Sequence, residues 1–293
     1  MGVSPQADRS PSLRDLLDKY NLRPRKGLGQ HFLADPNILR KIVAAAELSP
    51  ETVVLEIGPG LGTLTRQLVG SAGRVVAVEL DEAMIGVLRE ELGHLSNLEL
   101  VRGDILQLDP AQLIRGSRSL DLASPLEYVV VANLPYYITS AAMRHLLEAD
   151  PPPTLLVLTV QREVALRIVA RPGDMSLLAV SVQFYGQPRI VARIPAGAFV
   201  PPPQVDSAVV RIDTFPTPPI DVADIQAFFR VVRAGFGQKR KQLKNALAAG
   251  LGLPAAEVSA ALTRAGVDPR RRAQTLSLDE WAGLARELSG AWL

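Results

Sequence analysis

A short segment, Asn133-Leu134-Pro135-Tyr136, has the residue types that chemistry on an aromatic amine needs. The Asn133 side-chain oxygen and the Leu134 carbonyl oxygen can accept hydrogen bonds from such an amine, and Pro135 stiffens the segment so that they stay aimed. Tyr136 offers an aromatic face on which a flipped base can stack. The lone pair of adenine N6 is delocalised into the ring, so acceptors that draw this amine toward a pyramidal form make it more nucleophilic. The segment predicts methylation of a planar amine, with a plain Asn-Pro turn as the alternative.

A glycine-rich turn, with Glu56, Gly58, Gly60 and Gly62 at alternate positions, follows an apolar run and precedes a helical pattern. Glycines let the backbone turn sharply and approach a ligand, and the start of the helix offers free N–H groups. Glu79 ends the next apolar run, where a carboxylate can hold two ribose hydroxyls. Dinucleotide sites usually read Gly-x-Gly-x-x-Gly, whereas this spacing resembles the first motif of class I methyltransferases. The alternative is a structural turn with a surface glutamate.

A third run ends at Gly103-Asp104-Ile105. We expect Asp104 to accept a hydrogen bond from the adenine amine of S-adenosylmethionine and Ile105 to pack on its ring, with Leu80 at the same site. An aspartate that only caps a turn is the alternative for Asp104. Open α/β sheets bind ligands at the carboxyl ends of their strands, so these loops are expected to form one cofactor site.

The elements that must position these residues alternate regularly. Apolar runs predict strands at 53–57, 74–79, 98–101, 128–132 and 155–160, separated by helical stretches that include 83–92. Segments 177–185 and 187–194 fit either strand or helix, 205–212 reads as a strand, and 215–219 as a proline-rich linker. We expect an α/β fold, a Rossmann-like class I methyltransferase with a doubly wound, mainly parallel sheet, over residues 1–216. A small helical domain for RNA recognition is expected over 217–293.

Composition narrows the class of protein. The 293 residues include no cysteine, which excludes disulfides and zinc-thiolate sites, and three histidines lie far apart, so we expect no metal site. No apolar run is long enough to span a bilayer and no secretory signal is visible, so a cytoplasmic protein without a membrane partner is expected. Nothing in the sequence indicates an obligate oligomer, and a monomer is expected.

Four motifs together resemble the ribosomal RNA adenine dimethyltransferase family of the KsgA type. They are Gly29-Gln30-His31-Phe32-Leu33, the turn from Glu56 to Gly62, the segment from Asn133 to Ile138, and Phe199-Val-Pro-Pro-Pro-Gln-Val-Asp-Ser207. The resemblance runs from about residue 27 to beyond 245, and the motifs are highly specific in combination.

The resemblance implies transfer of two methyl groups to N6 of each of two adjacent adenosines, in a hairpin loop near the 3′ end of 16S ribosomal RNA within an immature small subunit. It further implies a sandwich of the target base between Phe199 and Tyr136. The cofactor contacts that it implies come from Gln30, His31, Leu33, Gly58, Glu79, Asp104 and Asn133. The family commonly has asparagine where this chain has His31, so binding with altered detail is expected there.

Basic residues are expected to hold RNA phosphates near this site: Arg25, Lys26, Lys239, Arg240, Lys241 and Lys244, with Arg270 to Arg272 less clearly involved. A solvated charged face is the alternative. Three other functions remain open at this point. They are an RNA-binding assembly factor with a vestigial cofactor site, a methyltransferase of large-subunit RNA, and a nicotinamide oxidoreductase, for which no hydride-transfer residues are visible.

Overall fold

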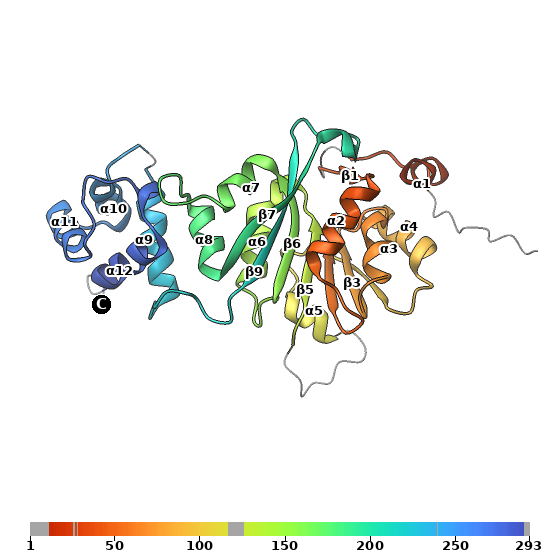
Figure 1. Cartoon of the computed structure of the whole chain (residues 1–293), viewed down its shortest axis with the longest axis horizontal. Coiled ribbons are helices and arrows are strands. Elements are labelled where there is room, and N and C mark those ends of the chain that lie inside the picture. The colour runs from red at the N-terminus through yellow and green to blue at the C-terminus, as the bar shows by residue number, and fades with distance from the viewer. Residues whose placement is uncertain (1–11, 26, 28, 117–125, 239, 290–293) are drawn as a thin grey trace, which may run out of the picture.

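The computed structural model describes residues 12–25, 27, 29–116, 126–238 and 240–289. A seven-stranded sheet forms its centre, with strand order β4-β3-β2-β5-β6-β9-β7 (Figure 1). The first five strands are parallel: β2 (Val53–Ile57), β3 (Arg74–Glu79), β4 (Leu98–Arg102), β5 (Val129–Asn133) and β6 (Leu155–Gln161). The last two, β9 (Ser207–Thr214) and β7 (Gly186–Ile194), run antiparallel to their neighbours. The expected doubly wound, mainly parallel sheet is confirmed.

The order of the strands reverses between β2 and β5. Val54 of β2 pairs with Val129 of β5, and the register continues to Ile57 beside Ala132. After β2 the chain adds β3 and β4 on one side, and after β5 it adds β6 on the other. The connections that follow β2 and β5 therefore leave in opposite directions, and a crevice lies between the carboxyl ends of these two strands. Such sheets bind ligands in this crevice.

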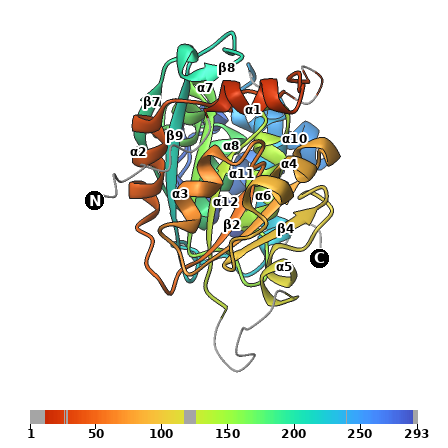
Figure 2. The same ribbon diagram turned by 90° about the vertical axis from the view of Figure 1, so that its right-hand side faces the viewer.

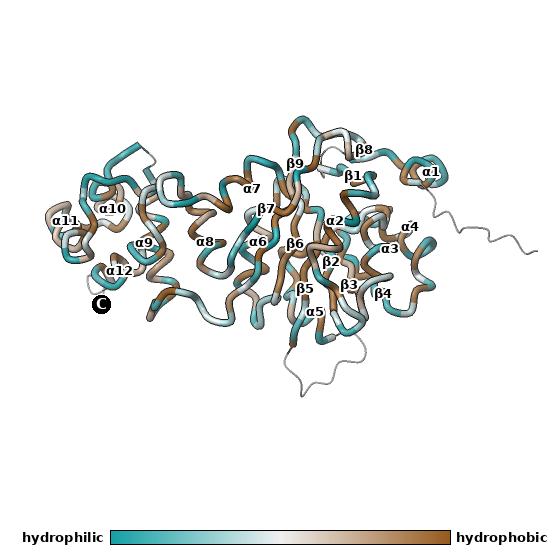
Figure 3. Tube along the Cα trace, in the orientation of Figure 1, coloured by the Kyte–Doolittle hydropathy of each residue, from teal (hydrophilic) through white to brown (hydrophobic). Residues whose placement is uncertain are grey.

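Apolar residues follow the strands of the sheet, and helices cover both faces (Figure 3). On one face, α2 (Pro36–Ala46) and α3 (Thr63–Val69) pack against the inner strands. On the other face lie α5 (Pro110–Gly116), α6 (Thr139–Leu147), α7 (Arg162–Ile168) and α8 (Leu177–Tyr185). At the edge of the sheet, α4 (Glu82–Leu92) packs with α1 (Leu13–Lys19).

The segments 177–185 and 187–194, which fit either a strand or a helix by sequence, form a helix and then a strand that meet at residue 186. Ser176 caps α8 by accepting a hydrogen bond from the Ala179 amide, and the chain then enters β7 directly at Gly186. A two-stranded antiparallel pair, β1 (Phe32–Leu33) and β8 (Phe199–Val200), is not predicted from sequence because each strand has two residues. This pair joins two segments that lie far apart in the chain.

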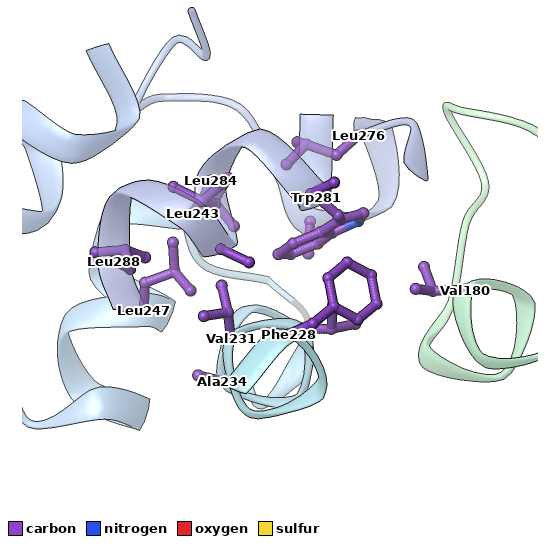
Figure 4. Packing of buried hydrophobic residues seen from close by; sticks show 14 of the residues in the cluster. Val180, Phe228, Val231, Ala234, Leu243, Leu247, Leu276, Trp281, Leu284 and Leu288 are labelled. Carbon is purple, nitrogen blue, oxygen red and sulfur yellow. The ribbon is translucent and has the colours of Figure 1, made fainter. Parts of the chain in front are cut away.

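The C-terminal region contains α9 (Ile225–Phe236), α10 (Leu243–Leu251), α11 (Ala255–Arg264) and α12 (Leu278–Ser289), as the helical periodicity predicts. In the view of Figure 2 these helices lie behind the sheet. Their core continues into α8: the fully buried Trp281 packs near Phe228, which faces Val180 of α8 (Figure 4). The rings of Phe184 and Phe228 are stacked with centroids 5.0 Å apart. The helices are therefore attached to the sheet region through a continuous apolar core.

Within the described ranges no helix combines the length and hydropathy that crossing a membrane requires.

Candidate active site

A pocket opens at the carboxyl ends of β2, β3 and β5, under the segment that precedes β1. Its lining residues are Gly29, Gln30, His31, Phe32, Gly58, Gly60, Glu79, Leu80, Asn133, Leu134, Pro135, Tyr136 and Tyr137. Ten of the residues expected at the catalytic and cofactor sites are among them. The glycine-rich turn and the segment from Asn133 to Tyr136 thus meet in the crevice where the strand order reverses.

Backbone pairing between distant segments closes one side of this pocket. Phe32 of β1 lies opposite Val200 of β8, and the imidazole Nδ1 of His31 lies 2.8 Å from the Pro201 carbonyl oxygen. The Asn133 side-chain nitrogen donates a hydrogen bond of 3.0 Å to the His31 carbonyl. Three of the four sequence motifs are therefore joined around one residue, His31.

The orientation of the Asn133 amide follows from that contact. A backbone carbonyl only accepts, so the nitrogen of the amide must face His31 and the Oδ1 oxygen remains as an acceptor. The Tyr136 hydroxyl lies 2.7 Å from the Ser207 hydroxyl, and its ring is stacked with that of His31 at 5.9 Å between centroids. The site thus holds an acceptor and an aromatic ring in fixed positions at one edge of the pocket.

Glu79 is buried at the end of β3, and both its oxygens accept backbone hydrogen bonds. One bond of 3.0 Å comes from the Gly60 amide, and another of 2.9 Å comes from the Asp81 amide. Burial raises the pKa of Glu79, while the hydrogen bonds from Asp81, Gly60 and Leu80 act in the opposite direction. Each carboxylate oxygen keeps a further lone pair for a ligand hydroxyl. Glu79 therefore fixes the glycine turn and remains able to bind ribose.

Gly58 and Gly60 both have positive φ, at 69° and 58°, which favours glycine. A Cβ at Gly60 would also lie 2.8 Å from the Phe32 ring. We expect Gly60→Ala to lower the free energy of unfolding by about 1–3 kcal/mol through strain and overpacking, and to weaken cofactor binding. Gly86→Ala on the exposed face of α4, where a Cβ meets nothing, is expected to stabilise by about 0.5–1 kcal/mol. Denaturant unfolding measures the free energy of unfolding of both variants. An equal change in this free energy for Gly60→Ala and Gly86→Ala would contradict the tight fit at Gly60.

Glu56 is 1% exposed, and neither carboxylate oxygen has a hydrogen-bond partner of good geometry among the described residues. Burial raises its pKa from 4.5 to about 8; the nearby Thr65 hydroxyl opposes this shift and the charge of Glu79 adds to it. The folded protein therefore keeps a proton that the unfolded chain releases above about pH 4.5.

Stability of the ligand-free protein should consequently fall as pH rises from about 4.5 to about 8 and level off above that range. We expect Glu56→Gln to remove most of this slope and to be a few kcal/mol more stable than the unmodified chain at alkaline pH. Thermal unfolding across pH measures the effect. Glu82→Gln, at an exposed position, should keep the original slope; an unchanged slope in Glu56→Gln would refute the assignment.

The residues present fit S-adenosylmethionine, which carries a positively charged sulfonium and ammonium. The described lining contains the carboxylate of Glu79 and no lysine or arginine. A cationic ligand therefore finds a buried carboxylate in this lining. Gly58 and Gly60 let the backbone approach it, and the half-exposed Leu80 offers an apolar surface.

Several expected site residues lie outside the pocket lining, and their roles stay predictions. Leu33 is buried in β1, Gly62 caps the start of α3, and Ile105 is buried beneath the sheet. The Asp104 carboxylate accepts a hydrogen bond of 3.0 Å from the Leu106 amide, so it caps its own turn.

The structure does not place Phe199 opposite Tyr136. Its side chain is 2% exposed and packs in the core beside α2, because β8 pairs with β1 and turns Phe199 inward. A contact between Phe199 and a base, which stays a prediction, needs a rearrangement of this segment.

Two aromatic residues of the pocket were not singled out by sequence reasoning. Tyr137 is 63% exposed, and Phe32 packs on Gly60. Each is the sequence neighbour of a predicted site residue: Tyr137 follows Tyr136, and Phe32 follows His31. The adjacent pair of tyrosines was the feature of the sequence that could have identified Tyr137. Gln30, expected to bind cofactor, also has a positioning role: it donates a hydrogen bond of 3.0 Å to Asp81, the N-cap of α4.

The predicted RNA-binding residues lie in two places. Arg25 is exposed and lies 3.4 Å from the Asp81 carboxylate beside the pocket. Arg240 and Lys241 are exposed between α9 and α10, and Lys244 is half-buried in the first turn of α10. Lys26 and Lys239 lie outside the described residues. Arg270 and Arg271 each pair with a nearby acid, Asp268 and Glu280.

Comparison with known proteins covers both the sheet and the C-terminal helices. The model of the family described as ribosomal RNA adenine dimethylase matches residues 21–289. A ribosomal RNA small subunit methyltransferase A from Dehalococcoides mccartyi is 48% identical over 280 residues, 94% of this chain and 93% of the relative. One from Moorella thermoacetica is 45% identical over 275 residues, 93% of this chain and 95% of the relative.

Solved structures share the fold over a similar range. The 23S rRNA methyltransferase ErmE superposes with a TM-score of 0.68 at 30% identity, covering 88% of this chain and 99% of that one. A dimethyladenosine transferase from Plasmodium falciparum has a TM-score of 0.70 at 26% identity, covering 89% and 98%.

Proposed function

The chain belongs to the ribosomal RNA adenine dimethylase family, and from that premise we propose that it dimethylates N6 of two adjacent adenosines in the 3′-terminal hairpin loop of 16S ribosomal RNA. The methyl donor is S-adenosylmethionine. Relatives that are 45% and 48% identical are named small subunit methyltransferases, which supports the small subunit as the target. The observation that carries the proposal is the Asn133 amide, whose nitrogen is occupied by His31 and whose oxygen is left to accept from an amine beside Tyr136.

The reaction needs few groups from the protein. S-adenosylmethionine, when bound, supplies an electrophilic methyl group on a positively charged sulfur, so the leaving group needs no proton. Glu79 would hold the ribose hydroxyls of the bound cofactor, and Leu80 would pack on its adenine. Tyr136 stacks on the flipped target base, while Asn133 Oδ1 and the Leu134 carbonyl accept from its amine and aim the lone pair. A strong general base is not required, because the amine proton leaves after transfer.

The region from residue 217 to 293 is proposed to recognise RNA, with phosphate contacts from Arg240, Lys241 and Lys244. Arg25, at the rim of the pocket, is proposed to contact the backbone next to the target base. The substrate is proposed to be 16S ribosomal RNA within an immature small subunit, met by a monomer in the cytoplasm.

Methyl transfer to ribosomal RNA tests this function. Purified protein and isotope-labelled S-adenosylmethionine are incubated with immature small subunits, with naked 16S transcript and with large-subunit RNA, and the products are mapped by mass spectrometry. Dimethyladenosine at two adjacent positions of the 3′ hairpin is expected. Label found only in large-subunit RNA, or none at all despite cofactor binding in calorimetry, would overturn the proposal.

A further inference from the structure

A second cavity, of about 270 Å³, lies between α6, α8 and α9, away from the methyl-transfer pocket; we call it the junction cavity. Its apolar wall includes the buried side chains of Met143, Leu147 and Val182. Tyr185 and Phe229, whose rings are stacked at 6.1 Å between centroids, add aromatic surface. The cavity therefore offers a planar apolar group a place to bind.

Polar groups stand around this apolar wall. The hydroxyls of Ser140 and Ser181 line the cavity, and at its rim Arg144 donates to the Glu148 carboxylate at 2.9 Å. Such groups can meet the donors and acceptors at the edge of a nucleobase.

Two arginines mark the place where the junction cavity meets a wider cleft of about 710 Å³. Arg167 of α7 and Arg233 of α9 line both hollows. The cleft also contains Lys241 and the carboxylates of Glu163 and Asp174. Both arginines are exposed, and neither forms an ion pair or side-chain hydrogen bond with any residue that the structure describes. The other lining arginine of the cavity, Arg144, is paired. Two unpaired guanidinium groups beside an apolar cavity suit a ligand with a planar body and adjoining anionic groups.

We propose that the junction cavity binds a nucleobase of the ribosomal RNA, from a nucleotide other than the one being methylated, while adjoining phosphates contact Arg167 and Arg233. The inference rests on the proposed function and adds a second anchoring point to it. Continuity with a cleft whose cationic side chains outnumber its carboxylates favours a polyanion over a small molecule. Moreover, α6 begins directly after the loop of Tyr136, and Ser140 and Arg144 lie within about 12 Å of that loop along the helix at 1.5 Å per residue. A short stretch of RNA therefore reaches both places.

Two kinds of variant separate the phosphate contacts from the base contact. The double variant Arg167→Gln/Arg233→Gln is expected to bind unmodified 16S transcript about tenfold more weakly. It should also lower the slope of log affinity against log salt by about 1.4 to 1.8, because two phosphate contacts are lost. Ser181→Phe fills the cavity and is expected to weaken binding roughly tenfold with an unchanged salt slope, because base stacking is lost while the cations remain.

One control variant and one control measurement accompany this test. Arg14→Gln removes an exposed arginine of α1 that forms no ion pair with a described residue. It lies at the other end of the molecule, and its loss should leave both affinity and slope nearly unchanged. S-adenosylmethionine affinity should stay the same in every variant, which shows that each one folds. Ser140→Phe fills the cavity from the opposite wall and replaces Ser181→Phe if the latter fails this check.

The outcomes distinguish the two proposals. Wild-type salt dependence in the double variant, or wild-type affinity in a folded cavity-filling variant, overturns the junction-cavity proposal even when the protein methylates 16S RNA normally. Failure of the unmodified protein to methylate small-subunit RNA overturns the proposed function instead.

Discussion

Asn133→Ala should lower kcat for methyl transfer by about 10³ while the dissociation constant for S-adenosylmethionine changes only a few-fold. The substitution removes the Oδ1 acceptor that is expected to act on the amine during transfer, so the loss should appear in the chemical step. It also removes the donor to the His31 carbonyl, which holds the segment before β1 over the pocket. Single-turnover methylation with saturating RNA separates the chemical step from binding.

Asn37→Ala is a suitable control for this experiment. Asn37 is an exposed asparagine in the first turn of α2, and its side-chain oxygen accepts a hydrogen bond from Arg40. Its kcat should lie within twofold of that of the unmodified protein. If Asn133→Ala instead raised the cofactor dissociation constant 100-fold and left kcat intact, Asn133 would be a cofactor ligand rather than the group that acts on the amine.

Glu79→Gln should weaken binding of S-adenosylmethionine roughly 100-fold, equivalent to about 2.7 kcal/mol. The amide nitrogen that replaces one oxygen cannot accept, so either the Gly60 or the Asp81 amide loses its buried partner. The negative charge that favours a cationic ligand disappears as well. Isothermal calorimetry with the cofactor, without RNA, measures the effect directly.

Glu82→Gln provides the matched control, because Glu82 is exposed and its ion pair with Arg102 lies at the surface, where such pairs contribute little. Its cofactor affinity should be unchanged. An affinity of Glu79→Gln within threefold of the original would mean that the glycine turn keeps its shape without the carboxylate and that ribose binds elsewhere.

The strands of the sheet were predictable because buried parallel strands appear as uninterrupted apolar runs. The runs at 53–57 and 74–79 coincide with β2 and β3. Segment 177–185 was not assignable, since its residues are mostly apolar and fit a buried strand as well as a helix packed on two faces. Its helical form depends on the core that it shares with α9 and α12, which are distant in sequence.

The candidate site divides in a similar way. Gly58, Gly60, Glu79 and Asn133 lie in the pocket because their positions follow from strand ends alone. Phe199 could not be placed by that reasoning. The direction of its side chain is set by the pairing of β8 with β1, and a register of two residues leaves no pattern in the sequence. The contact between His31 and Pro201 depends on the same pairing.

The apolar core that α8 shares with the C-terminal helices has a consequence for exchanging parts between related enzymes. Phe184 and Val180 would be left on an open apolar face if the chain were cut after residue 216, and such faces promote aggregation. A chimera that exchanges the C-terminal helices alone would also have to match a foreign surface to α8. The smallest unit that could be exchanged with its core intact therefore comprises α8 and the helices α9 to α12. This unit is not continuous in sequence, because β7 and β9 lie between α8 and α9 and belong to the sheet.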